Sequence, residues 1–332
     1  MPADTDNSPP SVFCDICPKS CQLHPGQRGD CRIRANVDGQ VSPITYGRPC
    51  SIQVDPIEKK PFFHYYPGTK ILSLATVGCN LHCLNCQNRE ISQGNPEEQP
   101  TYDLPPVKVP LLAKAQVCPA VAYTYTEPLV CFEYTYDCSV ACREAGIRNA
   151  IVTAGYVNPD PLRRLCRVLD AATLDIKAMS DKFYREVCGA SLAPVLRTVE
   201  ILKEEGVYLE LSNLVIPTLN DSDAMLRDLC RWVKSHVGAE TPFHFLRFFP
   251  RHRLTDQPPT PAATLLRARD IARAEGLRHV YLGNLDVPGG EDTACAACGA
   301  VLIRRRHYAI VGNRVQAGQC PDCGHPVNGR WK

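Results

Sequence analysis

Short runs of apolar and β-branched residues recur through the middle of the chain and predict buried strands. The runs occupy residues 71–76, 121–124, 149–153, 173–176, 208–215 and 243–248. Segments with apolar residues at helical spacing separate them, at residues 129–145, 161–169, 194–205, 222–236 and 261–275. Gly146, Gly206 and Gly276 directly follow three of these segments, as expected where a helix ends in a left-handed residue.

Strands that alternate with helices predict right-handed βαβ units around a parallel sheet. The number of units suits an α/β fold with a full or partial (β/α) barrel, and an open doubly wound sheet is the alternative. Pro-rich residues 95–110 and Gly-containing residues 286–292 are the predicted linkers. We therefore expect a disordered tail at residues 1–11, an N-terminal Cys-rich metal-binding module at 12–69, the barrel at 70–290 and a zinc-ribbon-like module at 291–332.

Composition places the chain among folded proteins. Its 332 residues are 44% hydrophobic and 22% charged, which excludes wholesale disorder and collagen-like architecture. Lys and Arg number 37 against 35 Asp and Glu, so a net charge of +2 gives no indication of nucleic-acid binding. The first residues lack the apolar core of a secretory signal, and no apolar span of about 20 residues follows. These features predict a cytoplasmic protein without a membrane anchor.

Cysteine is the informative residue, because 19 cysteines in a reducing compartment are expected to be thiols or metal ligands. Eleven of them fall into three groups, which are considered in turn below. The other eight are expected to be small buried side chains without a role. They are Cys50, Cys118, Cys131, Cys138, Cys142, Cys166, Cys188 and Cys230.

The central group is a C-x3-C-x2-C run, Cys79, Cys83 and Cys86, directly after the first strand of the barrel segment. Reactive groups gather at this carboxyl edge of parallel strands. Three thiolates can hold three irons of a 4Fe-4S cluster and leave the fourth iron open to a substrate or cofactor. A structural zinc site with His82 as fourth ligand is the alternative.

With this run the sequence resembles the radical S-adenosylmethionine superfamily. The resemblance extends over residues 12–330 to a subgroup related to pyruvate formate-lyase activating enzymes, the AmmeMemoRadiSam system radical enzyme. The stretches that carry it are AYTYTEP at 122–128, LDIK at 174–177, LVIPTLND at 214–221 and TPFHFLRFFP at 241–250. The resemblance implies that an electron from the reduced cluster cleaves S-adenosylmethionine, and that the resulting 5′-deoxyadenosyl radical abstracts hydrogen from a substrate. It also implies an external electron donor and a protein substrate. The two candidate substrates are a glycyl residue of a partner protein and a Memo-like partner.

The same resemblance assigns cofactor contacts. Thr126 and Glu127 correspond to an element that meets the methionyl amine, and an ionised carboxylate suits that cation. Asp175 and Lys177 alternate along one strand, so they project to one face, and by resemblance they touch the amino-acid end of the cofactor. The residues alone allow alternative interpretations. Glu127 is equally well explained as a carboxylate at a helix N-terminus, and Asp175 and Lys177 as an internal salt bridge.

Three further positions are expected near the cofactor. Gly155 lies in a small-residue loop after the third strand, where a ligand can approach closely, and Asn213 and His244 lie on later strands. His244 is equally interpretable as a core histidine. The chain departs from the superfamily at Asn85, where an aromatic residue usually packs near the adenine, and Leu84 or Tyr156 are the candidate replacements.

The two flanking groups indicate further metals. Cys295, Cys298, Cys320 and Cys323 form two C-x2-C pairs typical of a tetrahedral ion, and zinc is favoured over rubredoxin-type iron. Cys14, Cys17, Cys21 and Cys31 can satisfy zinc or a second 4Fe-4S cluster, which would relay electrons, and the sequence leads us to favour zinc. Arg304, Arg305 and Arg306 are expected in a solvated turn rather than at an RNA contact.

Two functions of different classes follow. The first is an oxidoreductase-like radical enzyme that uses a 4Fe-4S cluster and S-adenosylmethionine, with zinc in its tail. The second is a non-catalytic zinc-binding interaction module whose tail recruits RNA or protein.

Overall fold

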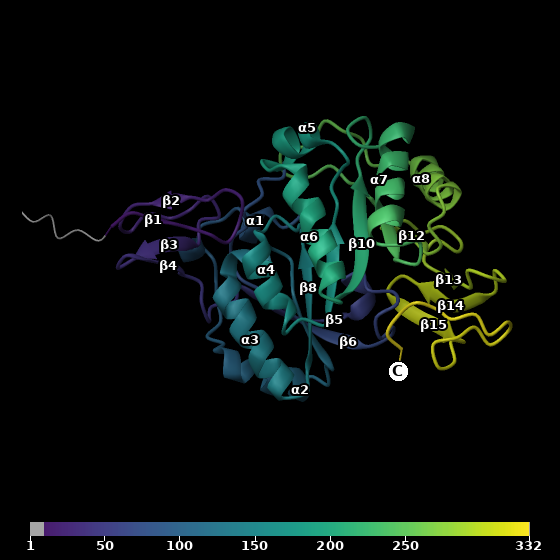
Figure 1. Cartoon of the computed structure of the whole chain (residues 1–332), viewed down its shortest axis with the longest axis horizontal. Coiled ribbons are helices and arrows are strands. Elements are labelled where there is room, and N and C mark those ends of the chain that lie inside the picture. The colour runs from purple at the N-terminus through teal and green to yellow at the C-terminus, as the bar shows by residue number, and fades with distance from the viewer. Residues whose placement is uncertain (1–9, 332) are drawn as a thin grey trace, which may run out of the picture.

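A computed structural model describes residues 10–331, and within them the main sheet has eight strands (Figure 1). Most of the predicted tail, residues 1–9, lies outside the described residues. The strands run in the order β12-β11-β10-β9-β8-β7-β6-β5, with β5 antiparallel to β6 and all other neighbours parallel. Their bounds are β5 Ser51–Pro56, β6 Lys70–Ala75, β7 Ala120–Tyr123, β8 Arg148–Thr153, β9 Ala171–Asp175, β10 Tyr208–Val215, β11 Phe243–Arg247 and β12 Val280–Gly283.

The strand order never reverses, and this decides between the two predicted architectures. A doubly wound sheet requires a reversal of order. Here every right-handed crossover advances by one strand, so the helices cover one face of the sheet and its other face forms a lumen. The edge strands β5 and β12 do not pair with each other in the described structure, so the barrel is partial, which is one of the two forms that the sequence predicted.

The five predicted helices are present. They are α3 Phe132–Glu144, α4 Pro159–Cys166, α6 Leu192–Glu204, α7 Asp223–His236 and α8 Ala262–Ala274. Gly146, Gly206 and Gly276 have φ angles of 75°, 74° and 98°, which confirms the predicted left-handed helix ends. Among described helices the longest, α7, has 14 residues, and none has the length and apolar character of a membrane span.

Sequence reasoning missed several short elements. Strands β5 and β12 were not expected, and the predicted linker 95–110 contains helical turns. Such short segments carry little periodicity, so only some of them can be recognised in the sequence. The remaining helices are α1 Arg89–Ser92, α2 Val109–Ala115, α5 Asp181–Phe183, the turns η1 Ile57–Lys59, η2 Pro96–Glu98, η3 Pro106–Lys108 and η4 Pro128–Cys131, and the π-turn η5 Tyr184–Cys188.

Aromatic side chains fill the amino-terminal half of the lumen. Small residues face inward at this level, namely Ala120, Ala122, Ala150 and Ala171. They leave space for Phe62 and Tyr65 from the segment after β5, and the Tyr65 ring stacks on Tyr208 at 5.4 Å. Since this half is packed, a ligand can enter only from the carboxyl edge.

The two Cys-rich ends form small antiparallel sheets on opposite sides of the barrel (Figure 1). At the N-terminus β1 pairs with β2 and β3 with β4, and at the C-terminus β13, β14 and β15 form one sheet. The bounds are β1 Val12–Phe13, β2 Gln22–Leu23, β3 Arg34–Val37, β4 Gln40–Pro43, β13 Thr293–Ala294, β14 Val301–Arg306 and β15 Ala309–Asn313.

The C-terminal sheet packs against the open side of the barrel. Arg305, 7% exposed, donates hydrogen bonds to the Phe63 carbonyl at 2.6 Å and to Thr293 Oγ1 at 2.8 Å. Thr293 also hydrogen-bonds Tyr281 of β12 at 2.9 Å. The expectation that Arg304–Arg306 form a solvated turn is therefore wrong: they lie on β14, and Arg305 joins the tail to the barrel.

Candidate functional site

The three central cysteines converge on one cavity of about 320 Å³ at the carboxyl edge of the sheet. Cys79, Cys83 and Cys86 line it together with the ends of four strands and the loops that follow them. The other lining residues are Lys59, Lys60, Pro61, Leu81, Asn85, Gln87, Asn88, Ser92, Thr124, Tyr125, Thr126, Glu127, Val152, Thr153, Ala154, Asp175, Lys177, Leu214, Leu246 and Asn284.

Backbone hydrogen bonds fix the cysteine loop at residues 79–86. His82 N donates to Cys188 O at 2.7 Å and Leu84 N to Val187 O at 2.9 Å, so the loop is attached to η5. The adjacent Cys188 thiol lowers the pKa of Cys83 below its ordinary value. Cys188, predicted to be a core residue without a role, is buried and also lies against a cysteine of the cavity.

The three central thiols are not all close enough together to bind one tetrahedral ion. Among described residues, three or more ligand atoms within 4.8 Å of one another occur only in the C-terminal tail. Thiolates on a single tetrahedral zinc lie about 3.8 Å apart at the usual Zn–S distance. Thiolates that bind separate irons of a cubane must lie farther apart. The central set therefore suits a 4Fe-4S cluster.

His82 is already engaged at both ring nitrogens. Nε2 lies 2.7 Å from Asp30 Oδ2, and Nδ1 lies 2.8 Å from Gln93 Oε1. Neither nitrogen is free to bind a metal without breaking one of these contacts, so the structure argues against His82 as a fourth zinc ligand.

Glu127 is fixed at the cavity wall. Its carboxylate is 1% exposed and accepts hydrogen bonds from Leu129 N at 3.2 Å, Ala154 N at 2.9 Å and the Thr153 hydroxyl. It caps the turn η4, so the alternative interpretation as a helix N-terminal carboxylate is confirmed, although the residue still lines the cavity. Burial raises the pKa of Glu127, and the three donors oppose that shift. The side chain is therefore a positioned acceptor.

Asp175 and Lys177, which line the same cavity, form an ion pair with 2.7 Å between Lys177 Nζ and Asp175 Oδ2. Burial by itself lowers the pKa of Lys177, but the Asp175 carboxylate and the Cys83 thiol raise it above its ordinary value. The Ser212 hydroxyl also donates to Asp175. The predicted salt bridge is thus present, and both of its members face the cavity. Thr126 lines the same cavity and donates to Thr76 O at 2.7 Å.

The structure does not bring Gly155, Asn213 or His244 to the lining of this cavity. His244 Nε2 lies 2.8 Å from Glu210 Oε2, both are buried, and His244 is therefore a core histidine. Asn213 Nδ2 donates to Ile176 O at 2.7 Å and ties β10 to the end of β9. At Gly155, φ is 71° and an added Cβ would lie 2.7 Å from Leu174 Cδ1, so the close approach is by a side chain.

The aromatic residue of the cavity is not one that the sequence suggested. Asn85 lines the cavity, whereas Leu84 and Tyr156 do not belong to its lining. Tyr125 is the aromatic residue that lines the cavity, and its backbone is left-handed with φ of 68°.

A buried ionic network that sequence reasoning missed surrounds this tyrosine. Asp55 accepts hydrogen bonds from Lys59 Nζ at 2.8 Å, Lys60 Nζ at 2.6 Å, Ser73 Oγ at 2.8 Å and the Tyr125 hydroxyl. Lys60 is 2% exposed at its side chain, and burial lowers its pKa to about 8. No local motif marks the network, because its members lie on β5, on β6, at the end of η1 and in the loop after β7.

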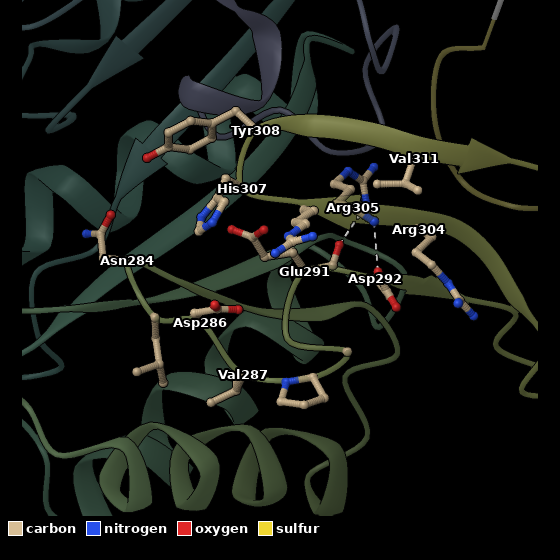
Figure 2. Close-up of a pocket in the computed structure, with 14 residues that line it drawn as sticks. Asn284, Asp286, Val287, Glu291, Asp292, Arg304, Arg305, His307, Tyr308 and Val311 are labelled. Atoms are coloured by element: carbon tan, nitrogen blue, oxygen red, sulfur yellow. Dashed lines mark hydrogen bonds between the residues drawn. The ribbon is translucent and has the colours of Figure 1, made fainter.

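A second, larger cavity of about 830 Å³ lies between residues 284–292 and the β14–β15 hairpin (Figure 2). Asp286 and Glu291 face Arg305 and His307 across it, so both signs of charge line it. Asn284 belongs to both cavities, which places the larger one beside the central site.

The tail cysteines form a compact tetrahedral set. Cys295 Sγ lies 3.6 Å from Cys323 Sγ, and Cys298 Sγ lies 3.8 Å from Cys320 Sγ. These separations match the value of about 3.8 Å expected for four thiolates on one zinc. The four thiols are therefore already placed to bind a single metal ion, as predicted.

Comparison with known proteins gives matches over most of the chain. Residues 73–230 match the radical SAM superfamily. Uncharacterized protein MJ0808 of Methanocaldococcus jannaschii is 44% identical over 319 residues, which span 96% of this chain and 95% of that protein. The pyruvate formate-lyase-activating enzyme of Clostridium pasteurianum is 27% identical over 51% of this chain and 73% of its own length.

More distant matches include a second activating enzyme and a solved structure. The benzylsuccinate synthase activating enzyme of Thauera aromatica is 22% identical over 50% of this chain and 54% of its own length. Among solved structures, Streptococcus suis SuiB bound to precursor peptide SuiA has a TM-score of 0.50 and 15% identity, and the match covers 69% of this chain and 51% of SuiB. This last similarity concerns the fold alone.

Proposed function

The chain belongs to the radical SAM superfamily, and we propose that its central cavity holds a 4Fe-4S cluster through Cys79, Cys83 and Cys86, with S-adenosylmethionine beside it. One observation carries the proposal: these three thiols, the Glu127 carboxylate and the Asp175–Lys177 pair line one cavity. A set of three thiols leaves one iron open for a cofactor.

With both groups bound, one-electron cleavage of S-adenosylmethionine supplies a 5′-deoxyadenosyl radical. The residues of this chain bind and orient. Glu127, held by three protein donors, is the acceptor for the cofactor ammonium, and Lys177 is the cation for its carboxylate. Val152, Leu214 and Leu246 supply apolar wall that keeps water from a reactive radical.

The substrate in this proposal is a residue of a partner protein. Relatives named as activating enzymes support it, and so does the larger cavity, which meets the central one at Asn284 and offers room for an extended segment. The resemblance to the AmmeMemoRadiSam subgroup makes a Memo-like protein the first partner to test and a glycyl segment the second. An external low-potential donor supplies the electron.

The test is anaerobic reconstitution with iron and sulfide, then dithionite and S-adenosylmethionine, with chromatography for 5′-deoxyadenosine. Wild type and Cys50→Ala should form it, since Cys50 is a half-buried cysteine outside the cavity. Cys83→Ala should not. Equal product from Cys83→Ala would overturn the proposal, as would a fully iron-loaded wild type that forms none with or without candidate partners.

The alternative, a non-catalytic zinc-binding module, is not favoured by membership in an enzyme superfamily. It predicts a colourless protein that contains zinc and no iron after anaerobic purification. Elemental analysis of the same preparation therefore separates the two.

A further inference from the structure

Four cysteines of the N-terminal module lie outside the central cavity. Cys14 follows β1, Cys17 lies in the β1–β2 connection, Cys21 precedes β2 and Cys31 precedes β3. Cys14, Cys17 and Cys31 are buried, with exposures of 6%, 8% and 6%, and Cys21 is half-buried. Two two-residue strands and one hairpin bring four thiols together without a disulfide among them.

Polar donors surround these sulfurs. Asp30 N lies 3.5 Å from Cys21 Sγ, the backbone N–H groups of Ile33 and Arg34 hydrogen-bond Cys31, and the Arg34 side chain contacts Cys14. Arg34 is itself fixed, since its guanidinium forms two hydrogen bonds with Glu133 at 2.8 and 2.9 Å. These N–H donors and the Arg34 cation partly offset the cost of burying negative charge on the sulfurs, as metal-bound thiolates require.

The spacing of the four sulfurs differs from that in the tail. Within residues 10–331, only the tail cysteines have their ligand atoms within 4.8 Å of one another. Among the described residues, no three sulfurs of the N-terminal set lie within 4.8 Å of one another, and this is also true of the central set. A cubane, whose four irons each take one thiolate, suits wider spacing, whereas one zinc does not. This observation replaces our sequence-based preference for zinc at these residues.

The N-terminal set lies directly against the central cysteine loop. A Cβ at Gly78, the residue before Cys79, would lie 2.9 Å from Cys31 O. The Asn80 side chain, 1% exposed, lies beside Cys17 and donates to Tyr156 O at 2.7 Å. Gly78 and Asn80 flank Cys79, so these two contacts bring Cys31 and Cys17 of the N-terminal module against the start of the central cysteine loop.

A charged contact reinforces the same junction. Asp30, the neighbour of Cys31, lies 2.7 Å from His82 Nε2 and 2.7 Å from Lys19 Nζ. The two cysteine groups are therefore joined by close backbone packing at Gly78 and by the contact between Asp30 and His82.

We infer that Cys14, Cys17, Cys21 and Cys31 hold a second 4Fe-4S cluster that relays single electrons to the central site. The inference rests on the proposed function of that site. A low-potential one-electron donor of the flavoprotein or iron–sulfur protein class is oxidised by one electron, which reduces the N-terminal cluster. The same electron then passes to the central cluster, which is reduced while the N-terminal cluster returns to its oxidised state, and no covalent bond changes in the relay.

The first test counts metal in the full-length chain after anaerobic reconstitution. Wild type and Cys50→Ala should hold about eight iron and eight sulfide, and the Cys79→Ala/Cys83→Ala/Cys86→Ala variant about four of each, from one remaining four-iron cluster. That variant, once reduced, should show the electron paramagnetic resonance signal of a 4Fe-4S cluster that S-adenosylmethionine does not perturb. A variant that holds zinc and no iron at the N-terminus overturns the inference.

A second set of variants removes N-terminal cysteines instead: the double variant Cys17→Ala/Cys31→Ala and the single variant Cys21→Ala. Cys21 is half-buried, so its replacement should disturb core packing least. Each should lose about four iron and keep the signal that S-adenosylmethionine perturbs. Retention of one zinc per chain in the tail reports that the variant is folded. Full iron content with an unchanged signal in Cys21→Ala and in the double variant contradicts a second cluster.

The relay is tested by changing the donor. With dithionite, which reaches either cluster, the N-terminal variants should still form 5′-deoxyadenosine, whereas with a photoreduced flavodoxin their rate should fall at least tenfold. Equal rates with flavodoxin overturn the relay. Failure of wild type to form product with either donor contradicts the proposed function instead, while the iron counts continue to test the second cluster.

Discussion

Lys60 Nζ lies 2.6 Å from Asp55 Oδ2 in the wall of the central cavity, and the Tyr125 ring lies 4.1 Å from the same ammonium. Burial lowers the pKa of Lys60 to about 8, from an ordinary value of 10.5. Between these values the unfolded chain holds one more proton than the folded chain.

This relationship predicts a pH dependence of stability. Because the unfolded state binds more protons in that window, the contribution of Lys60 to the free energy of unfolding rises with pH from about pH 8 to about 10.5, with a slope of at most about 1.4 kcal/mol per pH unit. Below pH 8 it is constant. Urea unfolding of wild type and Lys60→Met across this range measures it: the difference between the two curves should change with pH, and parallel curves would contradict the assignment.

Replacing Glu127 by Gln should cost stability and cofactor affinity together. Either orientation of the amide points an N–H group at a backbone donor, Leu129 N or Ala154 N. A buried unpaired donor costs about 1–3 kcal/mol. Urea denaturation measures the loss, and equilibrium binding of S-adenosylmethionine should weaken in parallel. Glu144→Gln, on the exposed side of α3, is the control and should change neither quantity.

Variants of the Asp175–Lys177 pair distinguish a role in stability from a role in cofactor binding. Asp175→Asn alone leaves the Lys177 charge without its partner, so unfolding should be easier. It also removes the carboxylate that orients Lys177 Nζ toward the cavity, so S-adenosylmethionine should bind at least tenfold more weakly. Asp175→Asn with Lys177→Met removes both charges and should recover stability but not binding. Recovery of binding in the double variant would show that the pair serves the fold alone.

Removal of the tail metal should loosen the tail without emptying the central site. Cys298→Ala breaks one ligand of the tetrahedral set at an exposed position, so the chain should lose its zinc because a three-thiolate site binds far more weakly. Elemental analysis should show zinc near zero with iron unchanged, and limited proteolysis should cut near residues 307–320. A loss of iron as well would indicate that the tail supports the central cavity.

Arg305 should be the residue that fastens the tail to the barrel. Its guanidinium donates to Phe63 O and Thr293 Oγ1 and lies 4.2 Å from the Phe63 ring. Arg305→Met should lower the free energy of unfolding by about 2 kcal/mol or more, since the Phe63 carbonyl and Thr293 lose a charged donor. Arg304→Met, an exposed neighbour on the same strand, should have little effect, and thermal unfolding of the two variants provides the comparison.

The sequence by itself determined the features that depend on neighbouring residues. Strand and helix alternation predicted the βαβ units, glycine positions predicted three helix ends, and cysteine spacing predicted the central and tail sites. Each is local, because a C-x2-C turn or a left-handed glycine involves only a few consecutive residues.

Only the tertiary structure decided which side chains share the central cavity. It paired His244 with Glu210, and it placed Leu174 against Gly155 where a ligand was expected. It also brought Lys60 into the cavity wall and the N-terminal thiols against the cysteine loop. These contacts join residues far apart in the chain, and they are set by how strands, hairpins and loops pack together, which no periodicity within one segment can encode.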